Sequence, residues 1–257
     1  MDIQIYRRKF KYACKNTDHI IAISQQTKED IISFYKIPEE KITICYQSCN
    51  PAFAQIISEN QKSRIKKFHT LPDRFFLYVG SIIERKNLLS ICKALYKLQG
   101  KLNIPLVVIG EGNKYKQQVK EFITQNNLEE QVIFLSETEA AKNSSAYQSA
   151  ADFPAIYQLS AGLIYPSVYE GFGIPVLEAL WSKVPVITSN ISCLPETGGD
   201  SAYYVDPYSP AEIAEGMMKL AADETLVREM KEKGWLHAQN FTPEKCAADV
   251  MQVYLRL

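Results

Sequence analysis

Short apolar runs recur along the chain, and each is followed by a turn and then by a segment with helical spacing. The runs are rich in Val, Ile, Tyr and Phe and do not alternate with polar residues, which is typical of strands covered on both faces. They span residues 19–23, 42–46, 75–79, 106–109, 132–135, 163–165, 184–187 and 203–205. Apolar runs that alternate with helices at this spacing predict an α/β fold with a doubly wound parallel sheet.

Helical segments fill the intervals between the runs. Two of them have apolar residues at a 3.6-residue period, namely Leu88, Ile91, Leu95 and Leu98 in one and Val119, Phe122, Ile123 and Leu128 in the other. Ser209–Glu212 has the pattern of a capping box with proline at the first helical position. Thr242-Pro243 begins the last helix, in which we expect four residues to point inward: Ala247, Val250, Met251 and Tyr254.

The first 70 residues fit this alternation less well. They offer two strand candidates, one helix at 27–35, and a polar stretch at 58–67 that resembles a linker. Two strands cannot form an independent sheet. We therefore expect three parts: residues 1–70 as the remnant of another domain with a linker, residues 71–240 as the compact unit, and residues 241–257 as a C-terminal helix.

Composition narrows the function classes. The 257 residues are 46% hydrophobic and 23% charged, as in ordinary globular proteins. Twenty-nine basic residues balance 29 acidic ones, so no overall basic field favours nucleic acid. The six cysteines lack a CxxC pair, and no apolar stretch reaches the length of a membrane span. These features predict reduced thiols and a cytoplasmic location.

The first candidate site follows the run at 75–79. Open α/β sheets bind ligands at the carboxyl ends of their strands. Gly80 and Ser81 begin the loop there, and Arg85 and Lys86 follow at the start of a helix, where cations are unfavourable unless an anion binds. The pair is therefore a phosphate-site candidate, although it could equally be solvated on an exposed loop. Further along, the sequence Gly110-Glu111-Gly112 lacks the third glycine of a dinucleotide motif, and these could simply be turn glycines.

The most informative stretch is Tyr165–Leu180. Its loop carries Glu170, Gly171 and Gly173, and Glu178 lies one turn into the following helix. Loop glycines before a helix can bind a phosphate or hydroxyls through backbone N–H groups, and Glu178 could accept hydrogen bonds from a ribose. Three alternatives remain open on the residues alone: this ligand site, a glycosidase carboxylate pair, and ordinary surface or helix-dipole charges.

The spacing E-G-F-G-I-P-V-L-E resembles the E-x7-E signature of retaining GT-B glycosyltransferases, specifically the "group 1" set, glycosyltransferase family 4. Further motifs agree in order over essentially the whole chain. They are D-H-I-I-A-I-S from Asp18, E-K-I-T-I-C-Y from Glu40, Y-V-G-S-I-I-E-R-K-N-L from Tyr78, V-V-I-G-E-G from Val107, D-F-P-A-I-Y-Q-L-S from Asp152, V-P-V-I-T-S from Val184 and L-P-E-T-G-G-D-S-A from Leu194.

The resemblance implies a Rossmann-like domain, the C-terminal half of a GT-B fold, that binds a nucleotide-diphosphate sugar as donor. It implies three catalytic residues, with Arg85 and Lys86 on the pyrophosphate and Glu170 on the transferred sugar. Glu178 would bind the ribose, and the remaining donor contacts would come from Gly80, Ser81, Phe172, Gly173 and Ile174. The family uses no cofactor and no divalent metal.

By the same resemblance, the function is retaining transfer of a hexosyl group, of mannosyl type, to a glycan or lipid-linked acceptor. The remnant at 1–70 would belong to the N-terminal acceptor domain, and the last helix would cross back to it. Alternatives are a donor-binding module that is inactive alone, or a GT-B epimerase or phosphorylase. A peripheral position at the inner face of the membrane stays open, although membrane contact is not expected through the donor domain. The basic stretch at 6–12 more naturally forms a solvated helix face.

Three departures from the family pattern bear on the site. Many relatives have arginine where this chain has Ser81, so the cationic role falls on Arg85 and Lys86. The segment 136–151 is longer than expected, which leaves the nucleotide base undetermined. None of the three histidines lies in a motif that resembles the family's catalytic-site histidine.

Overall fold

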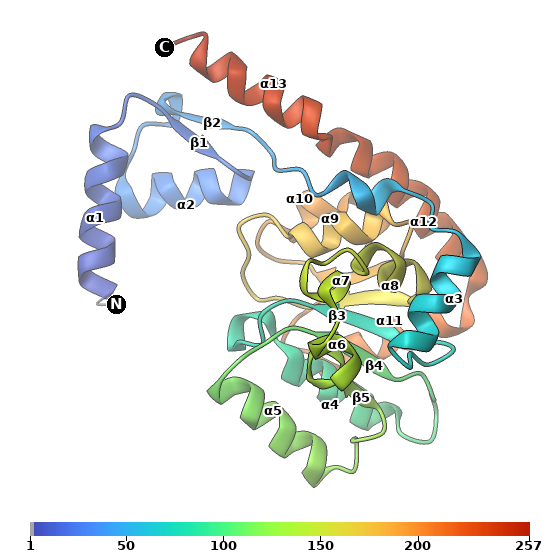
Figure 1. Ribbon diagram of the computed structural model, residues 1–257. Coiled ribbons are helices and arrows are strands. Elements are labelled where there is room, and N and C mark those ends of the chain that lie inside the picture. Colours follow the sequence, from blue (N-terminus) through green and yellow to red (C-terminus); the bar gives the residue numbers. More distant parts are fainter. Residues whose placement is uncertain (1–2) are drawn as a thin grey trace.

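The computed structural model describes residues 3–257 and has two units of unequal size (Figure 1). The smaller, N-terminal unit contains α1 (Ile3–Asn16), β1 (Ile20–Ala22), α2 (Gln25–Tyr35) and β2 (Ile42–Ile44). β1 and β2 pair in parallel, with Ile20 opposite Ile42. A small apolar cluster that includes Cys14, Ala22 and Ile31 holds this unit together.

The larger unit is built on a six-stranded parallel sheet with the strand order β5-β4-β3-β6-β7-β8. Its strands are β3 (Phe76–Val79), β4 (Leu106–Ile109), β5 (Val132–Phe134), β6 (Gly162–Tyr165), β7 (Val186–Ser189) and β8 (Tyr203–Val205). The chain builds outward from β3 to β5 on one side and from β6 to β8 on the other. The order therefore reverses between β3 and β6, where open α/β sheets form a ligand crevice at the carboxyl ends of the strands.

Helices cover both faces of this sheet. They are α3 (Glu59–Phe68), α4 (Leu88–Leu98), α5 (Lys114–Gln125), α6 (Glu139–Lys142), α7 (Ser145–Gln148), α8 (Phe153–Leu159), α9 (Ile174–Trp181), α10 (Leu194–Gly198), α11 (Pro210–Ala222) and α12 (Glu224–Ala238). The last helix of the chain is α13 (Pro243–Tyr254). Alternate residues of β3 enter two separate cores: Leu77 packs on the side of α8 and α9, and Phe76 on the side of α4 and α11. The predicted α/β class with a doubly wound parallel sheet is confirmed.

Local signals account for most helix boundaries. All eight apolar runs form strands, with ends shifted by at most two residues. Ser209 accepts a hydrogen bond from the Glu212 amide at 3.3 Å, as the capping box predicts. The Glu212 carboxylate, however, accepts from the backbone N–H of Asp206 at 2.9 Å, so only half of the box forms.

The prediction of a linker at 58–67 is wrong. Glu59–Phe68 is the helix α3, with Ser58 as its N-cap, and it packs on α8 with Ile65 in the core. Phe53 also packs against Tyr157, with ring centroids 5.1 Å apart. Residues from about 51 onward therefore belong structurally to the larger unit rather than to the N-terminal one.

The predicted inward face of the last helix is also wrong. Val253 is buried, whereas Ala247 is exposed and Met251 and Tyr254 are 53% and 65% exposed. The reason is position: α13 leaves the larger unit and runs toward β2 (Figure 1), so little of its surface contacts a core.

Two further features concern the cysteines and the helices. The six cysteines are free thiols, four of them buried, as expected for reduced cysteines. Within residues 3–257, no helix combines the length and apolar character needed to cross a membrane.

Candidate functional site

The loops that follow β3 and β6 meet at the point where the strand order reverses. Arg85 and Lys86 from the first loop both contact Glu170 from the second. The Arg85 Nη1 atom lies 2.7 Å from Glu170 Oε2, and the Lys86 Nζ atom lies 3.0 Å from Oε1. The backbone joins the loops as well, because the Val168 amide donates to the Arg85 carbonyl at 2.8 Å. The structure therefore brings all three predicted catalytic residues into direct contact.

Glu170 is the centre of this cluster and is only 8% exposed. Its Oε1 atom also accepts hydrogen bonds from the hydroxyls of Tyr165, at 2.8 Å, and Ser167, at 2.9 Å. Burial alone would raise the pKa of Glu170, but the charge of Lys86 and the hydrogen bonds from Lys86, Arg85 and Tyr165 lower the pKa below its ordinary value. Glu170 is therefore a buried, ionised carboxylate, which excludes the surface-charge alternative.

The cations are held by the local backbone of the first loop. A 3₁₀ turn at Glu84–Lys86 ends at Asn87, which has a left-handed conformation with φ of 61°. The Asn87 side chain donates to the carbonyls of Pro166, at 3.0 Å, and Pro207, at 2.7 Å. Lys86 is only 11% exposed, whereas Arg85 is 41% exposed. Because Lys86 is mostly buried, the alternative in which both cations are solvated on an exposed loop is excluded.

Of the predicted donor-binding residues, Gly80 lies beside these charges, and Gly173 lies at the start of the helix that follows the Glu170 loop. Gly80 has a φ of +143°, and a Cβ there would lie 3.0 Å from Lys86 Cδ, so the loop backbone runs against the lysine stem. Gly173, with a φ of +98°, is the N-cap of α9, and Ile174 begins that helix. Phe172 is buried and packs against Tyr46 and Phe241. Ser81 follows Gly80 in the same loop, and its carbonyl accepts from the Tyr78 hydroxyl at 3.1 Å.

Glu178 has a separate environment. It faces Tyr157 of α8, whose hydroxyl donates to Glu178 Oε2 at 2.7 Å. Within residues 3–257, no hydrogen bond or ion pair joins the Glu178 carboxylate to Arg85, Lys86 or Glu170. Burial raises the pKa of Glu178 to about 7, despite the opposing effect of the Tyr157 hydrogen bond. A group this deep in α9 is not a partner for the helix dipole at the first turn. Glu170 is therefore ionised at neutral pH, whereas Glu178 changes its charge in this pH range.

We expect the pH dependence of stability to report the buried Glu178. The folded-state pKa of about 7 lies above the ordinary value of 4.5, so the folded protein binds this proton more tightly. The contribution of Glu178 to the free energy of unfolding is fully present below pH 4.5 and is lost as the pH rises through 7. The total loss is about 3 kcal/mol. Glu178→Gln should therefore be about 2–3 kcal/mol more stable than the parent at pH 8, and equal to it near pH 4.5, in urea unfolding.

The control for this prediction is Glu121→Gln, at an exposed position on α5. That variant should follow the parent at every pH. Parallel stability curves for Glu178→Gln and the parent between pH 4.5 and 8 would contradict a raised pKa for the buried Glu178.

Several site residues were not found from the sequence. The hydroxyls of Tyr165, Ser167 and Tyr157 complete the two glutamate environments, and Asn87 holds the cation loop. The only available signal was polar atoms at the end of an apolar strand run, as at Tyr165. Gly110, by contrast, was noted only as a possible turn glycine. Its backbone lies directly against Gly80, because a Cβ there would be 1.9 Å from the Gly80 carbonyl oxygen.

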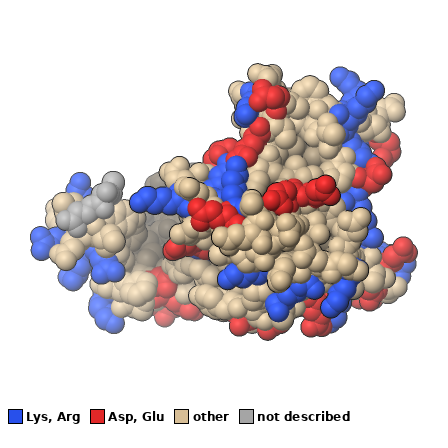
Figure 2. Space-filling view, turned by 90° about the horizontal axis from the view of Figure 1, so that it is seen from below, with Lys and Arg blue, Asp and Glu red and all other residues tan. Residues whose placement is uncertain are grey.

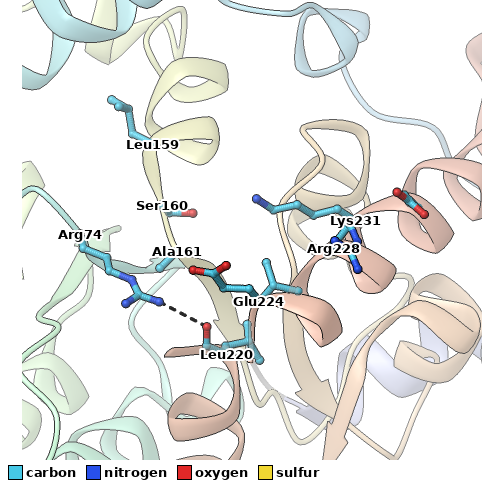
Figure 3. A pocket seen from close by; sticks show the side chains of 10 residues that line it. Arg74, Leu159, Ser160, Ala161, Leu220, Glu224, Arg228 and Lys231 are labelled. Atoms are coloured by element: carbon cyan, nitrogen blue, oxygen red, sulfur yellow. Dashed lines mark hydrogen bonds between the residues drawn. The ribbon is translucent and has the colours of Figure 1, made fainter. Parts of the chain in front are cut away.

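A pocket lies at the amino edge of the sheet, opposite the edge that carries Glu170 (Figure 3). It has a volume of about 590 Å³ and is lined by Arg74, Ala161, Leu220, Lys231 and others. The Arg74 guanidinium there donates to the Ala221 carbonyl at 2.8 Å and points to that of Leu220, at the end of α11. This arrangement indicates helix capping, remote from the strand ends that carry Glu170.

A doubly wound parallel sheet with cations, a buried carboxylate and a helix N-terminus at its reversal point belongs to the Rossmann-like class of folds. Residues 59–236 match the family described as "Glycosyl transferases group 1". The match covers more than half of the chain, and the chain belongs to this family.

Curated relatives are longer than this chain. The chain is 24% identical over 237 residues to the Escherichia coli "O-antigen chain mannosyltransferase B", covering 91% of this chain and 60% of the relative. It is 28% identical over 202 residues to the Salmonella typhimurium "O-antigen chain mannosyltransferase RfbU", covering 79% of this chain and 50% of the relative. The chain therefore spans between half and three fifths of the length of these two relatives.

Solved structures share the fold. A glycosyltransferase from Rickettsia africae superposes with a TM-score of 0.80 at 19% identity, covering 99% of this chain and 67% of that one. Anabaena HepE, solved in complex with UDP and glucose, superposes with a TM-score of 0.85 at 16% identity, covering 100% and 68%. The predicted GT-B membership is confirmed.

Proposed function

We propose that this chain binds a nucleotide-diphosphate sugar at the carboxyl edge of its sheet, and that the protein transfers the hexosyl group to an acceptor. The observation that carries the proposal is the pair of cations, Arg85 and Lys86, held around Glu170 where the strand order reverses. Family membership supports the reaction class. Two relatives are named O-antigen chain mannosyltransferases, which favours a mannosyl-type sugar. A glycan or lipid-linked acceptor belongs to the same proposal.

Arg85 and Lys86 are assigned to the diphosphate of the donor. In transfer, the bond between the anomeric carbon and the diphosphate oxygen breaks, and its electron pair stays on the diphosphate. An acceptor hydroxyl forms the new bond to that carbon and loses its proton. Cations beside the leaving group stabilise this growing negative charge more in the transition state than in the ground state. The backbone of Gly80 and Ser81 would contact the same phosphates.

The two glutamates are assigned to different parts of the donor. Glu170 would contact the transferred sugar, and a sugar hydroxyl would then replace one of the four groups that now surround its carboxylate. Glu178 would accept hydrogen bonds from the ribose. Backbone N–H groups of Phe172, Gly173 and Ile174 would complete the contacts to the sugar and phosphate. Retention of configuration and independence from divalent metal and other cofactors belong to this proposal.

A cytoplasmic location, with a peripheral position at the membrane left open, is part of the same proposal. The helix α1 carries exposed basic residues, and Figure 2 shows Lys and Arg side chains gathered at this end of the molecule. We assign no membrane contact to the donor-binding unit.

We expect Lys86→Ala to weaken binding of the donor by about 1.5–3 kcal/mol, or roughly tenfold to 150-fold, which is the scale of charge-assisted hydrogen bonds. The measurement is calorimetry with UDP-, GDP- and ADP-sugars, followed by titration of the best binder. Lys93→Ala is the matched control, because this substitution removes the same charge from an exposed position on α4.

Lys86→Ala also removes a partner of Glu170, so a second variant separates the two effects. Lys86→Ala with Glu170→Gln leaves no unpaired carboxylate in the site. Both variants are also titrated with the free nucleoside diphosphate, which lacks the sugar assigned to Glu170. Lost affinity for this ligand in both variants supports a direct role of Lys86 on the diphosphate. Unchanged affinity in a folded Lys86→Ala protein would contradict the proposed donor site.

A further inference from the structure

The first turn of α2 in the N-terminal unit contacts the larger unit through one carboxylate. Glu196 of α10 accepts hydrogen bonds from the backbone N–H groups of Gln25, at 2.6 Å, and Gln26, at 3.0 Å. These residues are the first two of α2 and lie about 170 positions from Glu196 in the sequence. The Tyr46 hydroxyl donates to the same carboxylate at 3.3 Å.

The geometry is that of a helix cap supplied from another unit. The first N–H groups of a helix have no acceptor within the helix. The side chain of Ser24, the N-cap of α2, accepts from the Thr27 amide at 3.0 Å, and its carbonyl accepts from the Lys28 amide at 3.1 Å. Glu196 takes the two amides that Ser24 does not reach. A carboxylate at this end also matches the positive end of the helix dipole, and its hydrogen bonds are charge-assisted.

The same turn of α2 lies against the loop that carries Glu170. Thr27 donates through its hydroxyl to the Gly171 carbonyl at 3.3 Å, and the Tyr169 hydroxyl donates to the Asp30 carboxylate. A Cβ on Gly171 would lie 3.0 Å from Ile23 Cδ1, so even a methyl group there would press against the N-terminal unit. The loop and the N-terminal unit are therefore in close contact.

The segment that contains Glu196 also holds that loop from behind. The Ser192 hydroxyl bonds both the amide and the carbonyl of Glu170, each at 3.0 Å. Thr197 donates to the Phe172 carbonyl through its hydroxyl. One short segment, residues 192–197, thus fixes the backbone of the loop on one side and caps α2 on the other.

We propose that Glu196 is a positioning residue that caps α2 from across the two units and so sets the N-terminal unit over the loop of Glu170. Separation of the units breaks both backbone hydrogen bonds together, so Glu196 favours the closed arrangement. For transfer, which rests on the proposed function, this contact sets the acceptor side of the site relative to the donor side.

Amide hydrogen exchange of the ligand-free 257-residue chain tests the proposal residue by residue. In Glu196→Ala, we expect the amides of Gln25 and Gln26 to exchange at least about tenfold faster, which corresponds to the loss of about 1.4 kcal/mol of protection. Amides of the central strands β3 and β6 should keep their exchange rates, and small-angle scattering should show a larger radius of gyration. A merely structural role in the larger unit would not produce this local pattern.

Tyr46→Phe is the matched control. It removes one hydrogen bond from the Glu196 carboxylate but keeps the ring that packs against Phe172 and Phe241. The Gln25 and Gln26 amides should stay within about twofold of the parent. If Glu196→Ala does not fold, Glu196→Gln carries the test. It keeps the side-chain volume but only one acceptor oxygen for the two amides, so at least one of the Gln25 and Gln26 amides should exchange faster.

Unchanged exchange at Gln25 and Gln26 in a folded Glu196 variant would overturn the proposal, as would equal acceleration throughout the chain. The measurement uses no nucleotide. A failure of donor binding would therefore contradict the proposed function alone, and a failure of the exchange pattern would contradict the Glu196 assignment alone.

Discussion

Gly110→Ala is expected to destabilise the larger unit by about 2–5 kcal/mol, because two costs combine at this position. Gly110 has a φ of +157°, which side-chain-bearing residues rarely adopt, and an added Cβ would lie 1.9 Å from the Gly80 carbonyl oxygen. That oxygen is backbone and cannot rotate away. Relief requires the loop after β3 to move, and this loop carries Arg85 and Lys86. We therefore expect donor binding to fall together with stability.

Two other glycines separate the costs in urea unfolding. Gly100 has a φ of +73° but nothing within 4 Å of an added Cβ, so Gly100→Ala should cost only about 1–2 kcal/mol. Gly112 has no positive φ, but its Cβ would lie 2.2 Å from the Ile82 carbonyl oxygen, so Gly112→Ala tests the clash alone. A Gly110→Ala protein no less stable than Gly100→Ala would show that the loop after β3 yields easily.

The sheet could be predicted from the sequence because its strands are buried on both faces. β3, β4, β6 and β7 are buried at every position, which produces the contiguous apolar runs. α3 escaped detection because it buries one residue, Ile65, among ten that are mostly polar. In α13 the apolar period is present, but the helix lies largely away from both cores, and periodicity does not reveal what a stripe contacts.

The candidate site could be predicted as a set of residues but not as a set of contacts. Strand ends and the E-x7-E spacing located Arg85, Lys86, Glu170 and Glu178. The spacing does not show that Glu170 is ion-paired to both cations, or that Glu178 is buried against Tyr157. It also says nothing of Glu196, whose partners at the start of α2 come from the other end of the sequence. Such long-range contacts depend on how the units pack, not on local pattern.

The purified 257-residue chain is expected to bind donor but to produce no glycan product. Holding acceptor and donor within ~3–3.5 Å of each other can lower the barrier by ~7–11 kcal/mol. Among the described residues, the N-terminal unit offers a two-stranded sheet and two helices, whereas the two mannosyltransferase relatives are much longer. Where the small N-terminal unit does not cover it, bound donor would face water. The high dielectric constant of water would weaken the contacts to its diphosphate. Slow hydrolysis of the donor is the most that we expect.

The assay for this prediction pairs calorimetry of donor binding with detection of glycan product from radiolabelled donor, and a full-length relative serves as the positive control. Because the donor contacts come from Arg85, Lys86 and the loop of Glu170, binding should survive where transfer does not. Absence of both would indicate that the donor site itself needs further chain. Transfer to any acceptor at ~1 s⁻¹ or faster, an ordinary enzymatic rate, would contradict the prediction. It would show that the small N-terminal unit, positioned by Glu196, is sufficient to hold the acceptor.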